Sequence, residues 1–224
     1  MTNIPFLILD VFATGKYTGN QLAVCLEAGA LTDLQMQQIA REINFSETTF
    51  VTNRELVNGG YNTRIFTPTT ELPFAGHPTL GTAFAIQQEI VKNPVERVNL
   101  NYQVGQIPVD LNYLNGEVDI LWMHQQPPKF YDAVEVELLA AVIGVNPTDI
   151  DAKYPIEPIS TGLPFIVMPL KTLAAVSQAK LNLDLYAKSV AKLPAQAILI
   201  FCPETIDPNR QLHVRVFTEC FGIP

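Results

Sequence analysis

An internal repeat is the feature that most limits how this chain can fold. A helix, a strand, a turn and a second strand occur twice in one register, 151 positions apart. Arg64-Ile-Phe-Thr aligns with Arg215-Val-Phe-Thr, Phe50 with Phe201, and Ile39-Ala-Arg41 with Val190-Ala-Lys192. The identities are few, but one unbroken register over these elements indicates two copies of one fold. We therefore expect two pseudo-symmetric α/β (α+β) domains, residues 1–112 and 113–224, with the boundary between about 88 and 116.

Hydrophobic patterning predicts the elements of each copy. The expected strands are 6–12, 22–26, 48–51, 63–67, 118–122, 165–168 and 197–202. The expected helices begin at Thr32, where Gln35 completes a capping box, and at Gly76, and in the second copy span 135–143 and 183–193. Residues 80–86 are apolar on every side of their helix, which is typical of a central buried helix.

Composition excludes several classes of function. The 224 residues carry 14 Lys and Arg against 22 Asp and Glu, a formal charge of −8, and no basic run, so nucleic acid is not an expected partner. Cys25, Cys202 and Cys220 are odd in number and far apart, which predicts neither a disulfide framework nor a zinc site but buried, unreactive thiols in a reducing compartment. With no basic segment leading an apolar N-terminal stretch, the sequence favours a soluble cytoplasmic protein without membrane partners.

Glu47 is the first candidate for chemistry. In the repeat it aligns with Ile198, so the first copy has a carboxylate where the second has an apolar residue. A carboxyl at a strand start beside Phe45 and Phe50 would have a raised pKa, which suits a general acid/base near neutral pH. The alternative is a solvated glutamate at the end of a strand.

The segment from Gly76 to Gly81 is the second candidate. Free N–H groups at the start of its helix could bind an anion, and His77 could donate a hydrogen bond to a substrate oxygen. The alternative is a tight turn between strand and helix. His124 and His213 lie in strand-like stretches and are expected to be structural, and the spacing of the three histidines supports no metal site.

Five segments together resemble one family. They are Asp10-Val-Phe-Ala, Gly19-Asn20-Gln-Leu-Ala-Val, Gln38 to Phe50 with Ser46-Glu-Thr-Thr, Arg64-Ile-Phe-Thr-Pro, and Glu71 to Ala83 with Phe74-Ala-Gly-His-Pro. Ser160-Thr-Gly-Leu-Pro-Phe extends the match into the second half. On these motifs the chain closely resembles the PhzF-like phenazine-biosynthesis family over essentially its whole length.

The resemblance implies a diaminopimelate-epimerase-like fold, in which two domains each wrap a curved sheet around a central helix and the active site lies between them. It further implies a cofactor-free and metal-free isomerase, commonly a homodimer, acting on a small carboxylate as in the isomerisation of trans-2,3-dihydro-3-hydroxyanthranilate. By this resemblance Glu47 moves the proton and His77 positions or protonates the substrate. The positions that match the family's substrate-binding residues are Asn20, Ser46, Gly76 and Ser160.

Two departures qualify the match. Related epimerases use a pair of cysteines, and Ala75 stands where one of them would lie, so a two-thiol mechanism is excluded here. The chain also stops at Pro224, the partner of Pro73 in the repeat, before a second Gly-His-Pro loop and central helix would follow. We therefore expect an incomplete second repeat whose core is poorly ordered.

Two further functions stay open at this point. A catalytically idle ligand-binding or structural homologue is the main rival to an isomerase, and the incomplete second repeat favours it. A thioesterase with a sheet wrapped on a helix is a weaker alternative, because the sequence offers no recognisable channel for a thioester. The identity of the substrate is not encoded in any motif of the chain.

Overall fold

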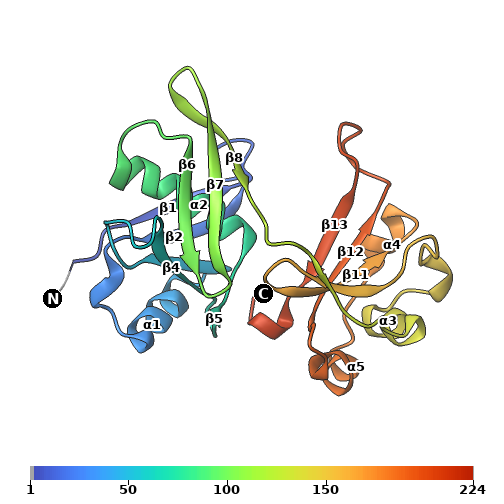
Figure 1. The fold of residues 1–224 in the computed structure, drawn as a ribbon. Helices are drawn as coiled ribbons and strands as arrows, with labels where there is room; N and C mark the ends of the chain where they lie inside the picture. The colour runs from blue at the N-terminus through green and yellow to red at the C-terminus, as the bar shows by residue number, and fades with distance from the viewer. Residues whose placement is uncertain (1–2, 224) are drawn as a thin grey trace. The chain divides into compact units, whose positions relative to one another are not determined.

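The computed structural model describes residues 3–223, which form two compact units (Figure 1). Unit 1 runs to Gln126 and includes the segment that begins at Phe221, and unit 2 comprises Pro127–Cys220. Both units are mixed α/β, as the sequence predicted. Pro224, which the repeat aligns with Pro73, lies outside the described residues.

Unit 1 is built mainly of strands. They are β1 (Phe6–Val11), β2 (Asn20–Cys25), β3 (Glu47–Val51), β4 (Tyr61–Phe66), β5 (Glu71–Leu72), β6 (Arg97–Tyr102), β7 (Gly105–Leu114) and β8 (Glu117–Met123). Its α-helices are α1 (Asp33–Ile43) and α2 (Gly76–Ile86), with a π-helical turn at Gln87–Val91. Within the described residues the strands form one sheet in the order β1-β2-β3-β4-β6-β7-β8, with β5 on β4.

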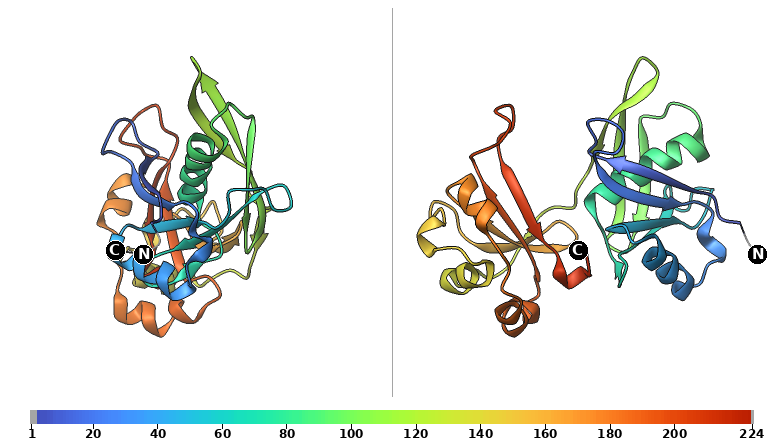
Figure 2. Two further views of the ribbon diagram at one scale, coloured as in Figure 1. Left: turned by 90° about the vertical axis from the view of Figure 1, so that its left-hand side faces the viewer. Right: turned by 180° about the vertical axis from the view of Figure 1, so that it is seen from behind.

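Helix α2 is the centre of unit 1. It contacts β1, β2, β3, β6, β7 and β8, so the sheet curves around it (Figures 1 and 2). Gly81 permits the closest approach, because a Cβ atom at this position would lie 2.6 Å from Leu22 Cδ2 and 2.9 Å from Val11 Cγ2. The all-round apolar pattern of this helix therefore predicted its central position correctly.

Helix α1 begins as its sequence predicted. The Thr32 side chain accepts a hydrogen bond from the Gln35 main chain, and the Gln35 side chain accepts one from the Thr32 main chain. This capping box satisfies two N–H groups that a helix start leaves free. Met36 and Ala40 face a small core that includes Phe50 and Phe66, on the side of β3 away from α2.

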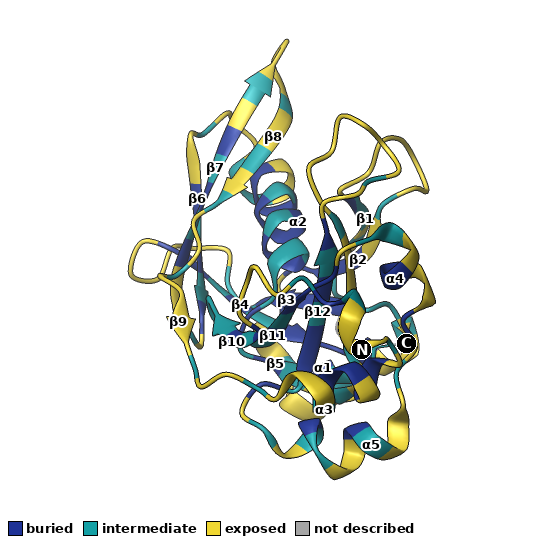
Figure 3. Ribbon diagram, turned by 90° about the vertical axis from the view of Figure 1, so that its right-hand side faces the viewer, coloured by how far each residue is buried: buried dark blue, intermediate teal, exposed yellow. Residues whose placement is uncertain are grey.

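Unit 2 has a five-stranded sheet among the described residues, in the order β13-β12-β11-β10-β9. Its strands are β9 (Lys129–Phe130), β10 (Glu157–Ser160), β11 (Pro164–Pro169), β12 (Ala197–Cys202) and β13 (His213–Phe217). Its helices are α3 (Val136–Ile143), α4 (Leu173–Gln178) and α5 (Leu183–Lys188). One face of β11 and β12 packs on these helices in a separate hydrophobic core, and β12 is largely buried (Figure 3).

The repeat is visible in strand pairing. In unit 1, β1-β2 is antiparallel, β2-β3 parallel and β3-β4 antiparallel, and β10 to β13 repeat this sequence of pairings in unit 2. A helical crossover joins each parallel pair. The described residues of unit 2 contain no helix in the position that α2 has in unit 1.

The register of the repeat differs by one residue from the sequence alignment. Arg64 pairs with Phe50, but Arg215 pairs with Ile200 rather than with Phe201. The structural counterpart of Glu47 is therefore Ala197 and not Ile198. Because Ala197 is also apolar, the contrast that singled out Glu47 remains.

The expected domain boundary differs from the observed division of the chain. Residues 88–116 were expected to separate the repeats, yet they supply β6 and β7, and unit 1 extends to Gln126. Asn115 and Gly116 join β7 to β8 with φ values of 54° and 87°, which is the hairpin turn that an Asn-Gly pair favours. Their turn signal marks a hairpin, not a linker.

One predicted helix is shorter than expected. The pattern over 183–193 gives α5 only to Lys188, followed by a 3₁₀ turn at Val190–Lys192. Ser189 interrupts the helix, with φ −127° and ψ −82°, and its hydroxyl donates to the Leu185 carbonyl. Side-chain to main-chain bonding of this kind competes with the helix.

Candidate active site

The register of the first sheet places Glu47 against α2. Glu47 is the first residue of β3 and lies opposite Leu22 of β2, whose side chain meets Gly81 of α2. Phe50, which was expected to desolvate Glu47, belongs to the core on the other face of β3. The carboxyl group is therefore enclosed on the side that faces the central helix.

Glu47 is almost completely buried, with 6% of its surface exposed. Its Oε2 atom has no hydrogen-bond partner among the described residues. Burial without compensation raises the pKa of the Glu47 carboxyl to about 7, because desolvation disfavours the charged form. The alternative of a solvated strand-end glutamate is wrong for this residue.

His77 approaches the same carboxyl from the first turn of α2. Its Nε2 atom lies 3.3 Å from Glu47 Oε2, and only 11% of its side chain is exposed. Burial lowers the pKa of His77 to about 4, although a main-chain contact with Gln21 opposes this shift. The distance would allow an ion pair, but both pKa shifts favour the neutral forms, and a pKa of about 4 leaves His77 uncharged at neutral pH.

Asn20 lies on the far side of the imidazole ring. Its Nδ2 atom is 3.3 Å from His77 Nδ1. Asn20 begins β2, so β2, β3 and α2 bring together three residues that are far apart in the sequence. The sequence singled out all three side chains, but only the fold shows that they form one linked group.

The start of α2 offers main-chain donors beside this group. Ala75 is the N-cap residue and its side chain cannot cap the helix, while Pro78 has no N–H. The N–H groups of Gly76 and His77 are thus the free donors of the first turn. A Cβ atom on Gly76 would meet only Met123 Cε, at 3.9 Å, so the space beside it is open.

Two threonines that sequence reasoning missed fasten α2 to β3. Thr82 Oγ1 lies 2.8 Å from Thr49 Oγ1 and 2.6 Å from the Pro78 carbonyl oxygen. Both threonines are fully buried. A hydroxyl on an otherwise apolar helix, and a second one two residues after Glu47, were the signals that could have identified them.

The other predicted binding residues are not part of this linked group. Ser46 precedes β3 and is partly exposed. Ser160 ends β10 in unit 2, where its Oγ accepts a hydrogen bond from the Gly162 N–H at 3.1 Å. A role for either residue in binding substrate stays a prediction.

His124 has a structural partner, as expected from its strand context. His124 Nε2 lies 2.6 Å from Asp110, which also pairs with Arg97. These two partners lower the pKa of Asp110 to about 2. Residues 3–223 contain no group of three or more His, Cys, Asp or Glu arranged to hold a metal ion.

None of Cys25, Cys202 and Cys220 forms a disulfide within the described residues. Cys25 and Cys202 are buried and Cys220 is partly buried. Burial raises the pKa of Cys25 to about 11 and that of Cys202 above its usual value, which makes both poor nucleophiles. The expected unreactive character is therefore supported for these two.

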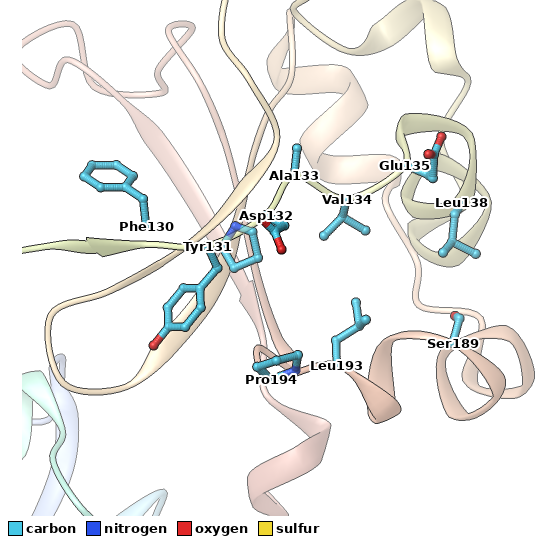
Figure 4. Close-up of a pocket in the computed structure, with 11 residues that line it drawn as sticks. Phe130, Tyr131, Asp132, Ala133, Val134, Glu135, Leu138, Ser189, Leu193 and Pro194 are labelled. Carbon is cyan, nitrogen blue, oxygen red and sulfur yellow. The ribbon is translucent and has the colours of Figure 1, made fainter.

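Unit 2 carries a separate pocket of about 640 Å³ (Figure 4). Its lining is mostly apolar and includes the carboxylates of Asp132 and Glu135 on the segment before α3. None of the predicted site residues lines it. The residues that line it include two acidic side chains and no basic one.

Solved structures define the class of fold. The Bacillus anthracis phenazine biosynthesis protein of the PhzF family is 31% identical, with a TM-score of 0.82 over 97% of this chain and 72% of its own. A hydroxyproline epimerase from Agrobacterium vitis is only 11% identical but matches 95% of the chain with a TM-score of 0.59. The fold is therefore that of the epimerase-like α/β proteins with curled sheets.

Sequence relatives define the family. The model of the phenazine biosynthesis-like proteins matches residues 9–224, and the chain belongs to this PhzF family of isomerases. The trans-2,3-dihydro-3-hydroxyanthranilate isomerase of Pseudomonas chlororaphis is 40% identical over 97% of this chain and 73% of its own length. An uncharacterized isomerase of Clostridium acetobutylicum is 30% identical over 96% and 72%.

The helices of unit 1 and unit 2 are all short. Within residues 3–223 no helix has the length and apolar character needed to cross a membrane.

Proposed function

We propose that this isomerase transfers a proton between two carbons of a small carboxylate substrate, with Glu47 as the single acid and base and without a cofactor. The observation that carries this proposal is the buried pair of Glu47 and His77, whose facing Oε2 and Nε2 atoms lie 3.3 Å apart without hydrogen-bond partners among the described residues. Polar atoms left open in a buried site are costly unless a ligand satisfies them.

The shifted pKa of Glu47 suits both halves of such a reaction. With a pKa of about 7, the carboxylate and the carboxylic acid are both well populated near neutral pH. Ionised Glu47 accepts a proton from a C–H group beside the substrate's unsaturated system, and protonated Glu47 then donates it to another carbon. The substrate keeps its composition and oxidation state, so the transfer requires no redox partner.

Neutral His77 and the start of α2 would stabilise the charge that develops. The imidazole N–H can donate to the substrate anion, and the N–H groups of Gly76 and His77 can hold its carboxylate at the positive end of the helix dipole. We infer a small unsaturated acid as substrate, as the relatives named trans-2,3-dihydro-3-hydroxyanthranilate isomerase suggest.

Proton exchange tests this proposal. In D₂O, wild-type protein should introduce deuterium into trans-2,3-dihydro-3-hydroxyanthranilate or its product, and Glu47→Gln should abolish this while binding is kept. Exposed Glu96→Gln serves as the matched control and should retain exchange. Exchange at the wild-type rate in Glu47→Gln would remove Glu47 from the mechanism. Ligand binding without exchange in the wild type would instead support an idle binding homologue.

A further inference from the structure

The tautomer of His77 is the property of the site that the proposed reaction leaves open. A neutral imidazole carries its proton on either Nδ1 or Nε2, and the partner of one nitrogen decides the state of the other. Each ring nitrogen of His77 has one polar side chain at 3.3 Å: Asn20 Nδ2 at Nδ1, and Glu47 Oε2 at Nε2. An amide nitrogen therefore lies at one nitrogen of the ring and a carboxyl oxygen at the other.

The local backbone places Asn20 where it can reach the ring. Asn20 pairs with Val11 at the end of β1 and follows Gly19. A Cβ atom on Gly19 would lie 2.5 Å from the Val11 carbonyl oxygen, so a larger residue would push this segment away. Because alternate residues share a face of a strand, Asn20 lies on the same face as Leu22, the residue opposite Glu47.

The amide nitrogen of Asn20 can only donate a hydrogen bond. It therefore requires a lone pair on His77 Nδ1, which puts the proton of the neutral ring on Nε2. The main chain of Gln21 also contacts His77 and raises its pKa, which opposes the effect of burial. Ionised Glu47 can only accept a hydrogen bond, so its Oε2 atom beside Nε2 also favours the tautomer with the proton on Nε2.

We propose that Asn20 is a positioning residue that holds neutral His77 in the tautomer whose Nε2–H faces Glu47 and the substrate. This inference rests on the proposed function for its catalytic meaning, but the tautomer exists without substrate. In this state His77 is a hydrogen-bond donor and not a second base. Because Nε2 then carries a proton, Glu47 is the base of this group. The Nε2–H of His77 is held in place to donate a hydrogen bond to the anion that develops on the substrate.

Nitrogen NMR of the full chain measures the tautomer directly. In ¹⁵N-labelled protein at a pH above the Glu47 value of about 7, long-range proton–nitrogen correlations distinguish a bare nitrogen from a protonated one. The signals of His77 are assigned by their loss in His77→Gln. We expect protonated Nε2 and bare Nδ1 in the wild type.

Asn20→Asp is the decisive variant. Its carboxylate can only accept, so it should move the proton to Nδ1 and lower the proton-exchange rate by about a hundredfold, as loss of one fixed donor does. Asn20→Ala removes the donor without adding an acceptor and should let the Nδ1–H tautomer become populated. Exposed Asn112→Asp makes the same change of charge and should leave the His77 signals unchanged.

Two outcomes overturn the inference. One is protonated Nδ1 in the wild type, which would mean that Asn20 does not set the tautomer. The other is an unchanged Nε2–H tautomer in both Asn20 variants. Neither outcome depends on turnover. If the wild type has the expected tautomer but Glu47→Gln leaves proton exchange unchanged, the proposed function is refuted. The role of Asn20 in setting the tautomer of His77 would still hold.

Discussion

At the scale of single residues, burial shifts Glu47 and His77 in opposite directions toward their neutral forms. The Glu47 pKa rises to about 7 and the His77 pKa falls to about 4. The order of the two values is thus reversed relative to free side chains. This pair therefore differs from a surface ion pair, whose charges are stabilised by their mutual attraction.

The raised pKa of Glu47 predicts a pH-dependent cost in stability. The stability that neutral Glu47 contributes is fully present below the usual glutamate pKa of 4.5. It is lost as pH rises through about 7, where the folded protein must bury a charge. Glu47→Gln should therefore be more stable than the wild type by ~3 kcal/mol above pH ~8 and about equal to it near pH ~4. Urea unfolding at the two pH values measures this, and an equal difference at both would contradict it.

The same pKa predicts the pH profile of proton exchange. In the proposed mechanism the ionised carboxyl of Glu47 accepts the first proton, so the exchange rate of the free enzyme should rise as pH passes through about 7. His77 is already neutral there, since its pKa is about 4, and should add no second inflection between these values. A rate that falls over this interval would assign the first step to a protonated group.

At the scale of elements, the site depends on how closely α2 lies against the strands. Two glycines of this helix have opposite surroundings. A Cβ atom on Gly81 would lie 2.6 Å from Leu22 Cδ2, whereas the space beside Gly76 is open. The hydroxyls of Thr49 and Thr82 fix the helix along β3. These contacts set where His77 stands relative to Glu47.

The glycine pair gives a direct test of packing. Gly81→Ala should destabilise unit 1 by about 1–3 kcal/mol, because the new methyl group overpacks against Leu22 and Val11. Gly76→Ala should leave stability near that of the wild type but weaken binding of a carboxylate at the helix start. Thermal unfolding and ligand titration of the two variants measure both effects, and equal losses of stability would contradict the packing argument.

The threonine pair is tested by a double-mutant cycle. Thr82→Val and Thr49→Val each leave the partner hydroxyl buried with fewer hydrogen bonds, at a cost of about 1–3 kcal/mol. The double variant should cost less than the sum of the two, by about 0.5–3 kcal/mol. Strictly additive unfolding free energies would mean that the two hydroxyls do not interact.

At the scale of the whole molecule, the two units share one pattern of strand pairing but differ in how their sheets are covered. Unit 1 has α2 inside its sheet, whereas the helices of unit 2 pack on the face of β12 that carries Ile198 and Ile200. On β13, Val214 and Val216 are exposed. Unit 2 nevertheless has its own core, which argues against the poorly ordered second half expected from the sequence.

Hydrogen exchange should show this difference between strands. β12 is paired on both sides by β11 and β13 and has one buried face, so its amides should exchange slowly. The outward-facing amides of β13, an edge strand of the described sheet, should exchange much faster. Exchange of β12 as fast as that of an exposed loop would restore the expectation of a poorly ordered second unit.

What the sequence determined lies mostly within short stretches. Thr32 and Gln35 cap a helix through atoms three residues apart, and the apolar character of residues 80–86 required a central helix. The alternation in β6 and β7, with Val98, Leu100, Ile107 and Val109 buried, was also present in the sequence and was overlooked. Such patterns can be predicted from the sequence because the residues that form them lie close together along the chain.

Only the tertiary structure decided how the candidate residues act together. Asn20, Glu47 and His77 come from β2, β3 and α2, and their 3.3 Å contacts depend on the register of the sheet and the depth of the central helix. A shift of one residue, like the one separating Ile198 from Ala197, moves a side chain to the other face of its strand. Burial and its pKa shifts follow from that packing, because desolvation depends on every neighbour and not on the residue alone.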